Sequence, residues 1–181
     1  MRRVVLGMQV SLDGFVARPG GELDWIWRTF DEEVKKSILD VLRGIDTYLL
    51  GRVNYLEQVA HWPEADDEVA PLLNAATKIV FSRTLDRLDW ANARLATDDP
   101  ATEIARLKQQ PGKDIAVGGG ASLARSLSEL GLIDEYSFVI HPILLGGGLP
   151  LFQGLPEPVG MELVAIRHFA TGAVHVRYRR N

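Results

Sequence analysis

Short apolar runs alternate with amphipathic stretches along the first two-thirds of the chain, and this alternation predicts strands separated by helices. Runs rich in β-branched and apolar side chains are typical of strands. They occur at residues 2–10, 46–50, 78–82, 94–97 and 115–117. Apolar residues three to four positions apart are typical of helices. Helices are expected at residues 31–43, 53–60 and 100–109, and from residue 121 onward.

The helix expected at residues 31–43 has the clearest pattern. Asp31 is placed to cap it, and the acidic residues that follow suit the positive end of the helix dipole. Its buried stripe is expected to consist of Val34, Ile38, Val41 and Leu42. The segment before it, residues 11–25, contains Gly14, Pro19, Gly20 and Gly21, which predicts a long loop.

From residue 133 onward the pattern changes to strands alone. The apolar run at residues 136–145 predicts a long strand, and two more strands near residues 162–169 and 173–179 flank Thr171-Gly172, a hairpin signal. Strands that alternate with helices and are followed by strands alone indicate a mostly parallel sheet with an antiparallel C-terminal edge. The chain is therefore expected to form one α/β domain over residues 1–181.

Composition narrows the class of protein without naming a function. The chain of 181 residues is 46% hydrophobic and 24% charged, with a net charge of −4 and no basic patch that would suggest nucleic acid. It has no cysteine, and its four histidines show no metal-ligand spacing, so no metal is expected. No apolar run reaches membrane-spanning length, and a cytoplasmic protein is expected by default.

Three consecutive glycines, Gly118–Gly120, are the most informative motif. They join the short strand at residues 115–117 to the helix that begins at Ala121. Glycines let a backbone approach a ligand closely, and the N-terminus of a helix favours a phosphate. The spacing does not fit the dinucleotide fingerprint, because its third glycine position is Leu123. A tight turn without a ligand remains the alternative.

Two further strand ends carry groups that bind anions. Gly51-Arg52-Val53-Asn54 follows the second strand, and Ser82-Arg83-Thr84 follows the third. Ligands of open α/β sheets collect at the carboxyl ends of the strands. Together the three strand ends suit a ligand with more than one phosphate, although either arginine alone is better explained as a solvated surface charge.

Five segments in order carry a family resemblance, namely SLDGFVA, LLGRVNYLEQ, KIVFSRTL, DIAVGGGASLARSL and LIDEYSFVIHPILLGGGLPLF. Together they resemble the dihydrofolate reductase-like superfamily. Within it they are most similar to the C-terminal reductase domain of the bifunctional deaminase-reductase of riboflavin biosynthesis and its stand-alone bacterial relatives. The resemblance implies a three-layer fold with a central sheet of about eight strands and helices on both faces. It also implies NADPH bound across the strand ends.

The resemblance also implies roles for individual residues. Val16 and Ala17 match positions beside the nicotinamide, the residues from Gly51 to Asn54 match a phosphate segment, and Ser82 to Thr84 match the segment that holds the 2′-phosphate. The pyrophosphate and nicotinamide-ribose loop corresponds to Val117, Gly118, Gly119, Gly120, Ala121, Ser122 and Leu123, with a cis peptide at Gly118–Gly119. The substrate side corresponds to Gln9, which also lies beside the nicotinamide, and to Ser11, Asp13 and Trp25.

One departure from dihydrofolate reductases concerns the substrate. Those enzymes carry a carboxylate on the first helix, partnered by a threonine on the strand that here has Ile140. The core-facing helix positions here are Val34 and Ile38, and capping explains the acids Asp31 to Glu33. Protonation of a pterin nitrogen needs an acid near the hydride acceptor. Turnover of dihydrofolate is therefore expected to be weak or absent, and no residue is assigned as the proton donor.

Three functions follow from the resemblance. The first is an NADPH-dependent reductase of a pyrimidine- or pteridine-like heterocycle. The second is an NADPH-binding sensor without turnover, and the third is the riboflavin-pathway 5-amino-6-(5-phosphoribosylamino)uracil reductase itself. A homodimer is expected, because stand-alone relatives tend to dimerise and residues 143–152 are apolar. Gly146–Gly148 is interpreted as a lid or a static turn, and His141 as a strand-end residue.

Overall fold

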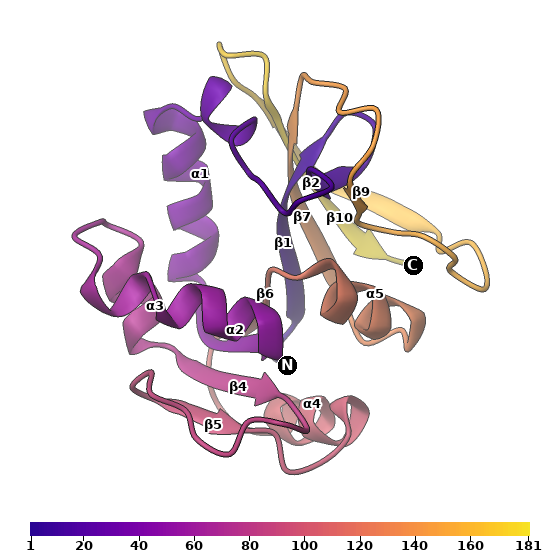
Figure 1. Cartoon of the computed structure of the whole chain (residues 1–181). Helices are drawn as coiled ribbons and strands as arrows, with labels where there is room; N and C mark the ends of the chain where they lie inside the picture. Colours follow the sequence, from indigo (N-terminus) through magenta and orange to yellow (C-terminus); the bar gives the residue numbers. More distant parts are fainter.

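An eight-stranded sheet organises the computed structural model, which describes residues 1–181 (Figure 1). The spatial order of the strands is β5-β4-β3-β6-β1-β7-β10-β9. Their bounds are β1 Val4–Ser11, β3 Ile45–Gly51, β4 Thr77–Phe81, β5 Ala93–Leu95, β6 Asp114–Gly118, β7 Glu135–His141, β9 Met161–His168 and β10 Val174–Arg180. All pairs from β5 to β7 are parallel, whereas β10 pairs antiparallel with both β7 and β9. The predicted mostly parallel sheet with an antiparallel edge is confirmed.

Helices cover both faces of the sheet. They are α1 Glu32–Arg43, α2 Arg52–Val59, α3 Ala70–Ala75, α4 Pro100–Gln109 and α5 Ala121–Glu129, with short 3₁₀ turns at Ile26–Arg28 and Trp62–Glu64. On one face, side chains of α4 and α5 pack with Leu6 of β1 and Val117 of β6. On the other, α2 and α3 pack against Leu50 of β3, and Val34 of α1 packs against Val139 of β7. These two covered faces give the expected three layers (Figure 1).

The strand predicted at residues 136–145 and the loop predicted at residues 11–25 both differ from the structure. The strand expected at residues 136–145 ends at His141, because Pro142 has no N–H to donate. The following residues form a loop that ends in β8 Leu149–Pro150, which pairs with β2 Phe15–Ala17 in a separate two-stranded sheet. Pattern alone did not predict this second sheet.

The buried side of α1 also differs from the predicted stripe. Val34 is buried as expected, but Ser37 and Leu39 are the other buried positions. Ile38, Val41 and Leu42 are only half-buried. The helix contacts both the sheet and α3, so its buried surface is turned from the stripe expected for a helix that packs on a sheet alone. None of the helices combines the length and apolar content that a membrane crossing requires.

Candidate functional site

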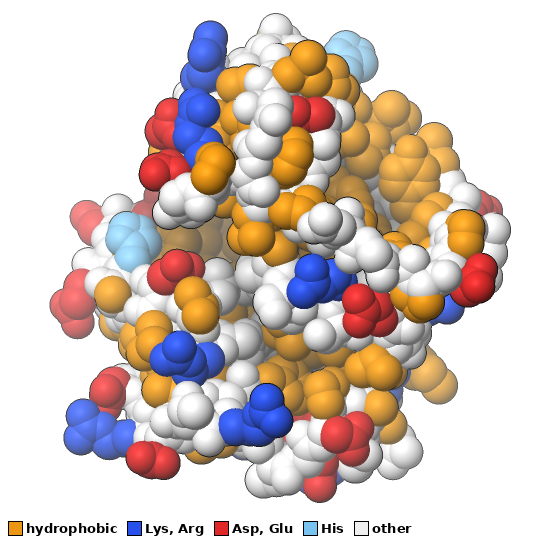
Figure 2. All heavy atoms as spheres, turned by 45° about the vertical axis from the view of Figure 1, so that its right-hand side comes forward, with side chains coloured by type: hydrophobic (Ala, Val, Ile, Leu, Met, Phe, Trp, Pro, Cys, Tyr) orange, Lys and Arg blue, Asp and Glu red, His pale blue; other side chains and the backbone are white.

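Two paired glycines mark a hollow in the middle of the sheet. Gly7 of β1 lies opposite Gly118 of β6 in the parallel register. Leu6 and Met8 pack on the α4–α5 side, so Gly7 faces the side of α1 and α2. Gly7 is exposed, and a Cβ placed there would meet no atom within 4 Å. A central strand is thus open to solvent at Gly7, and Figure 2 shows apolar side chains lining recesses in the molecular surface.

Gly118, the partner strand's glycine, is crowded where Gly7 is open. A Cβ on Gly118 would overlap the ring of Tyr48 from β3. Burial raises the pKa of Tyr48 to about 12, so its hydroxyl stays protonated. Tyr48 packs beside α2 and α3, and its ring therefore forms the side of the hollow towards β3.

The glycine loop is held from α2. Gly119 and Gly120 have φ of +67° and +80°, conformations that side chains disfavour. A Cβ on Gly119 would lie 2.9 Å from the Asn54 amide nitrogen. The Gln58 amide donates both to Asn54 and to the Gly118 carbonyl, and its own Oε1 is buried without a partner. All peptide bonds are trans, so the expected cis bond is wrong: the two positive-φ glycines make the turn.

The helices that begin at this edge of the sheet fall into two kinds. Asp31 caps α1 by accepting from the Val34 N–H at 2.9 Å, and Asp99 caps α4. In contrast, α2 and α5 begin at Gly51 and Gly120 with no side-chain cap. Their strands, β3 and β6, are neighbours in the sheet. Two uncapped helix N-termini therefore lie at adjacent strand ends, where their N–H groups and dipoles favour an anion.

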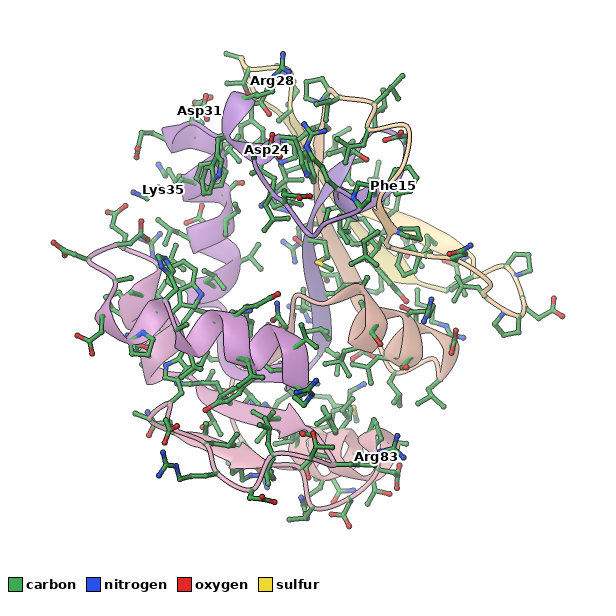
Figure 3. The ribbon with its side chains drawn as sticks, viewed as in Figure 1. Phe15, Asp24, Arg28, Asp31, Lys35 and Arg83 are labelled. Atoms are coloured by element: carbon green, nitrogen blue, oxygen red, sulfur yellow. The ribbon has the colours of Figure 1, made fainter.

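The other predicted strand ends lie along the same edge. The order β4-β3-β6 places Ser82–Thr84, Gly51–Asn54 and the glycine loop on three consecutive strands. Arg52 and Arg83 are exposed, and no carboxylate lies within ion-pairing distance of either. Ser82 Oγ accepts from the N–H groups of Thr84 and Leu85 and so shapes the turn. Figure 3 shows Arg83 at the opposite end of the molecule from Arg28.

A second polar group lies at the carboxyl ends of β1 and β7. His141 Nε2 is 2.6 Å from Gln9 Oε1, and His141 Nδ1 is 2.6 Å from Thr29 Oγ1. The Trp25 ring meets the imidazole edge-on, with 5.3 Å between centroids. His141 is only 1% exposed, and burial lowers its pKa to about 4. The structure thus joins the predicted residues Gln9 and Trp25 through a neutral histidine that sequence reasoning treated as a strand end.

Strand alternation explains why the importance of His141 was missed. Val139 packs against Val34 of α1, so Ile140 points to the opposite face and His141 returns to the α1 side. At the carboxyl end of β7, the polar side chain on this side is therefore His141 rather than the residue at position 140. Thr29 and the α2 residue Gln58 were also missed, since no local pattern marks either.

Ser11 and Asp13 bind protein groups in this structure. Ser11 donates to Asp13 Oδ1 at 2.7 Å, and this bond, with the N–H groups of Leu145 and Gly146, lowers the pKa of Asp13. A Cβ on Gly148 would overlap the carbonyl oxygen of Ala17. The loop after β7 is thus fastened to the loop after β1, which favours the static turn over the lid.

Val16 and Ala17 lie in β2 and are buried. They sit beneath these fastened loops, and Val16 packs in the same apolar cluster as Val117 of β6. Of the predicted residues, those of the glycine loop and Asn54 form one group, and Gln9 and Trp25 form another. Ser82–Thr84 lies outside both, two strands away from β6.

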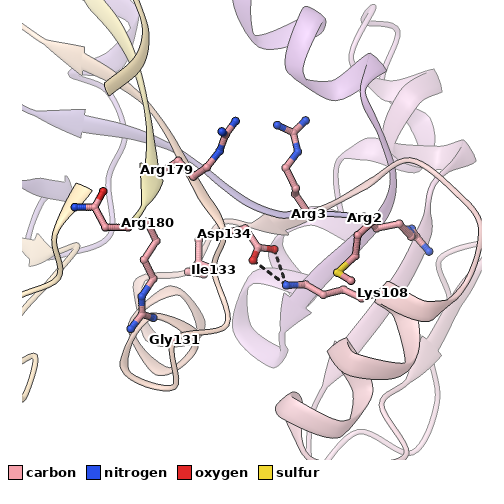
Figure 4. Close-up of a pocket in the computed structure, with 10 residues that line it drawn as sticks. Arg2, Arg3, Lys108, Gly131, Ile133, Asp134, Arg179 and Arg180 are labelled. Atoms are coloured by element: carbon pink, nitrogen blue, oxygen red, sulfur yellow. Dashed lines mark hydrogen bonds and ion pairs between the residues drawn. The ribbon is translucent and has the colours of Figure 1, made fainter. Parts of the chain in front are cut away.

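A second hollow lies at the amino ends of the strands, but charged side chains around it are already paired. Figure 4 shows Lys108 beside Asp134 in this cavity, which has a volume of about 380 Å³. Arg3, on the same wall, binds Asp114 and the fully buried Glu135. No group of three or more His, Asp or Glu side chains in the chain is arranged to hold a metal ion. The candidate site is therefore the hollow over Gly7, with the uncapped helices beside it.

Comparisons with known proteins show the family of the chain. A family model described as the RibD C-terminal domain matches residues 2–175. The uncharacterized protein YyaP of Bacillus subtilis (strain 168) is 37% identical over 185 residues, covering 99% of this chain and 96% of its own length.

Solved structures confirm the fold predicted from the resemblance. A putative riboflavin biosynthesis protein from Shewanella sp. PV-4 superposes with a TM-score of 0.83 at 23% identity, over 99% of each chain. Dihydrofolate reductase from Enterococcus faecalis, solved with NADP(H), superposes with a TM-score of 0.65 at 14% identity, over 99% of this chain and 96% of its own. The fold is therefore dihydrofolate reductase-like.

The two paired glycines predict opposite responses to the same substitution. Gly118→Ala forces the Tyr48 ring to move and is expected to lower the free energy of unfolding by about 1–3 kcal/mol. Gly7→Ala is the matched control, because its methyl group enters open space, and it is expected to change stability by less than about 1 kcal/mol. Urea unfolding measures both. Equal losses from the two substitutions would contradict the assigned packing.

Buried His141 predicts a loss of stability in mild acid. Its pKa falls from the ordinary value of 6.5 to about 4 on folding, so the folded state binds fewer protons between these values. The free energy of unfolding should therefore drop as pH falls from 6.5 to 4, by up to about 3 kcal/mol from this residue. Burial, with Arg177 and Arg167, also lowers the pKa of His175, which adds to the drop.

The variant His141→Gln should flatten this dependence in urea unfolding measured across the pH range. The exposed β9 residue His168 supplies the control, and His168→Gln should leave the dependence as in the wild type. A wild-type slope that survives in His141→Gln would show that other groups cause the acid sensitivity.

Proposed function

The chain belongs to the RibD C-terminal domain family, and on that premise we propose that it is an NADPH-dependent reductase of a pyrimidine- or pteridine-like heterocycle. The observation that carries the proposal is the carboxyl edge of β4-β3-β6. There, two uncapped helices begin beside a hollow in the sheet, and two unpaired arginines follow β3 and β4.

The residues present fit a cofactor with several phosphates. The pyrophosphate would be held by backbone N–H groups of Gly118–Gly120 and of the first turn of α5, residues 121–123. No side chain caps this helix. Asn54 and the α2 N-terminus would share that charge with Arg52, and Val53 lies exposed beside them. The buried Oε1 of Gln58 has no partner in the protein, which supports a ligand donor nearby.

Arg83, with Ser82 and Thr84, would meet the 2′-phosphate that distinguishes NADPH from NADH. A guanidinium binds such a group through two parallel hydrogen bonds. No carboxylate lies within ion-pairing distance of Arg83. Val16 and Ala17 would lie beside the nicotinamide, as the family resemblance implies. When bound, the cofactor supplies the hydride.

The residues of this chain would bind the heterocycle and orient it against the cofactor. Gln9 and Trp25 would contact the heterocycle above the hollow at Gly7, while the fastened loops at Ser11–Asp13 and residues 145–148 keep that end of the site closed. Asp31 is engaged as the cap of α1, and the carboxylates of α1 itself, on Glu32, Glu33 and Asp40, are exposed. The proposal therefore assigns no proton donor to a side chain.

One assay distinguishes the reductase from its two alternatives, the NADPH-binding sensor and the riboflavin-pathway reductase. A sensor would bind NADPH without oxidising it in the presence of any heterocycle, whereas a reductase consumes it with at least one. The riboflavin-pathway substrate carries a phosphate, for which Arg18 and Arg28 were the candidates. Arg18 pairs with Asp24 at 2.7 Å, so only Arg28 is free for that role. A steady-state assay that follows the loss of NADPH over a panel of heterocycles tests all three functions.

We further propose a homodimer formed through the edge strand β9. All eight of its residues are exposed, among them Leu163, Val164 and Ile166. An uncovered apolar edge strand is a template for another chain, and a two-fold pair is the commonest way to cover it. Leu144 and Leu149, from the apolar run noted in the sequence, are also exposed.

Light scattering at micromolar concentration should return twice the chain mass of 20.0 kDa. Ile166→Glu places a charge on the exposed edge and should shift the protein to the monomer mass. Leu130→Glu, at an exposed site after α5, is the control and should remain a dimer. A wild-type mass of about 20 kDa would end the dimer proposal.

Cofactor choice gives the sharpest test of the reductase. A hydrogen bond to a charged group contributes about 1.5–3 kcal/mol, so Arg83→Ala should weaken NADPH binding about tenfold to a hundredfold in calorimetry. NADH lacks the 2′-phosphate and should bind the variant as it binds wild type. Arg87→Ala is the matched control, because Arg87 is on the same loop but is paired with Asp89. Equal weakening of both cofactors would remove Arg83 from the site, and failure of wild type to bind either would end the reductase proposal.

A further inference from the structure

Three side chains from separate parts of the chain form a continuous row beside the hollow. Gln9 lies on β1, His141 ends β7, and Thr29 lies between the first 3₁₀ turn and α1. Both contacts to the imidazole are 2.6 Å. Gln9 Oε1 has no hydrogen, so the His141 Nε2–H donates to it. The unprotonated Nδ1 then accepts from the Thr29 hydroxyl, and the row has a single direction.

This direction fixes which end of the Gln9 amide remains free. Because Oε1 is bound to His141, the NH₂ group is the end that stays available, and it has no hydrogen-bond partner in the protein. Gln9 is half-buried and lies two residues from Gly7 on the same face of β1, where the space is open. An N–H donor is therefore held at the margin of the hollow.

A second donor lies against the same histidine. Trp25 is 1% exposed, its ring meets the edge of His141, and its indole N–H is buried without a partner. A buried donor without an acceptor costs about 1–3 kcal/mol, which an acceptor on a ligand would recover. Two side chains that contact one imidazole thus each have an N–H donor without a partner in the protein.

We propose that His141 and Thr29 are positioning residues that turn the Gln9 NH₂ group into the cleft, so that the site selects a heterocycle bearing a ring carbonyl over the same ring bearing an amino group. This inference rests on the proposed function in that the ligand is the heterocyclic substrate. A carbonyl oxygen accepts from Gln9, whereas an amino group at the same position sets donor against donor. A site built to hydrogen-bond one group rejects the analogue that cannot pair.

The test compares 2,6-diaminopyrimidin-4-one with 2,4,6-triaminopyrimidine, above neutral pH and with NADPH present. The first has a ring carbonyl and a neighbouring ring N–H where the second has an amino group and an unprotonated ring nitrogen. Dissociation constants come from calorimetry or ligand-observed NMR. Wild type should bind the carbonyl compound at least about tenfold more tightly, the equivalent of one hydrogen bond. Gln9→Glu replaces the donor with an acceptor of the same shape and should reverse the preference.

The positioning residues are tested through the same ratio. Thr29→Val and His141→Phe should reduce the preference towards unity without changing NADPH affinity, and His141→Gln, which keeps a donor for Gln9 Oε1, should restore part of it. If His141→Phe fails to fold, the Thr29 and Gln9 variants still decide the matter. Equal binding of the two probes, binding of neither, or a preference unchanged in Gln9→Glu would overturn the inference.

The outcome is separable from that of the proposed function. Failure of wild type to bind NADPH would end the reductase proposal, yet the probe preference measured without cofactor would still test the Gln9 donor. Conversely, NADPH oxidation with no change of preference in Gln9→Glu would keep the reductase and remove this selection device.

Discussion

The absence of two Cβ atoms in adjacent strands is the constraint on which the rest of the site depends. Gly118 lacks a side chain where the Tyr48 ring lies, and Gly7, opposite it in the register, lacks one where the space is open. A larger residue at Gly118 would displace the ring, and one at Gly7 would begin to fill the hollow. The strand then continues into Gly119 and Gly120, whose positive φ turns the chain into α5. The position of the Tyr48 ring and the hollow over Gly7 therefore depend on the paired glycines of β1 and β6. The turn into the uncapped helix α5 depends on the two glycines that follow.

Charged side chains are paired differently at the amino ends and at the carboxyl ends of the strands. At the amino edge, buried Glu135 binds Arg3 and Arg177, and Lys108 binds Asp134, so cations and carboxylates satisfy each other. At the carboxyl edge, Arg52 and Arg83 stay unpaired and two helices begin without caps. A buried carboxylate without partners would be costly, whereas exposed cations are hydrated and cost little until an anion arrives. The paired charges at the amino ends of the strands contribute to folding, and the unpaired ones at the carboxyl ends are left free for a ligand.

Local sequence patterns predicted the parts of this arrangement that local physics decides. The Asp31 cap, the start of α4 at Pro100 and the hairpin at Thr171-Gly172 all depend on neighbours in the chain, and the structure has each of them. Strand order depends on pairing between distant segments, so the local pattern placed three candidate groups at strand ends but could not establish the order β4-β3-β6. His141 shows the same limit: its partners are 112 and 132 residues away, and a histidine before a proline gives no sign of them.

The polar groups around the hollow have a consequence for the kind of reaction the site supports. Asp31, the acid just before the first helix, accepts a hydrogen bond from the Val34 N–H, and burial keeps His141 neutral by lowering its pKa to about 4. Neither is suited to give a proton, since a general acid must be protonated and have a pKa near the working pH. A ring that must be protonated before it accepts hydride would therefore depend on water for that proton. A substrate that is already electrophilic, and that needs only to be bound and oriented against the cofactor, suits this site better, because binding and orientation are what its residues supply.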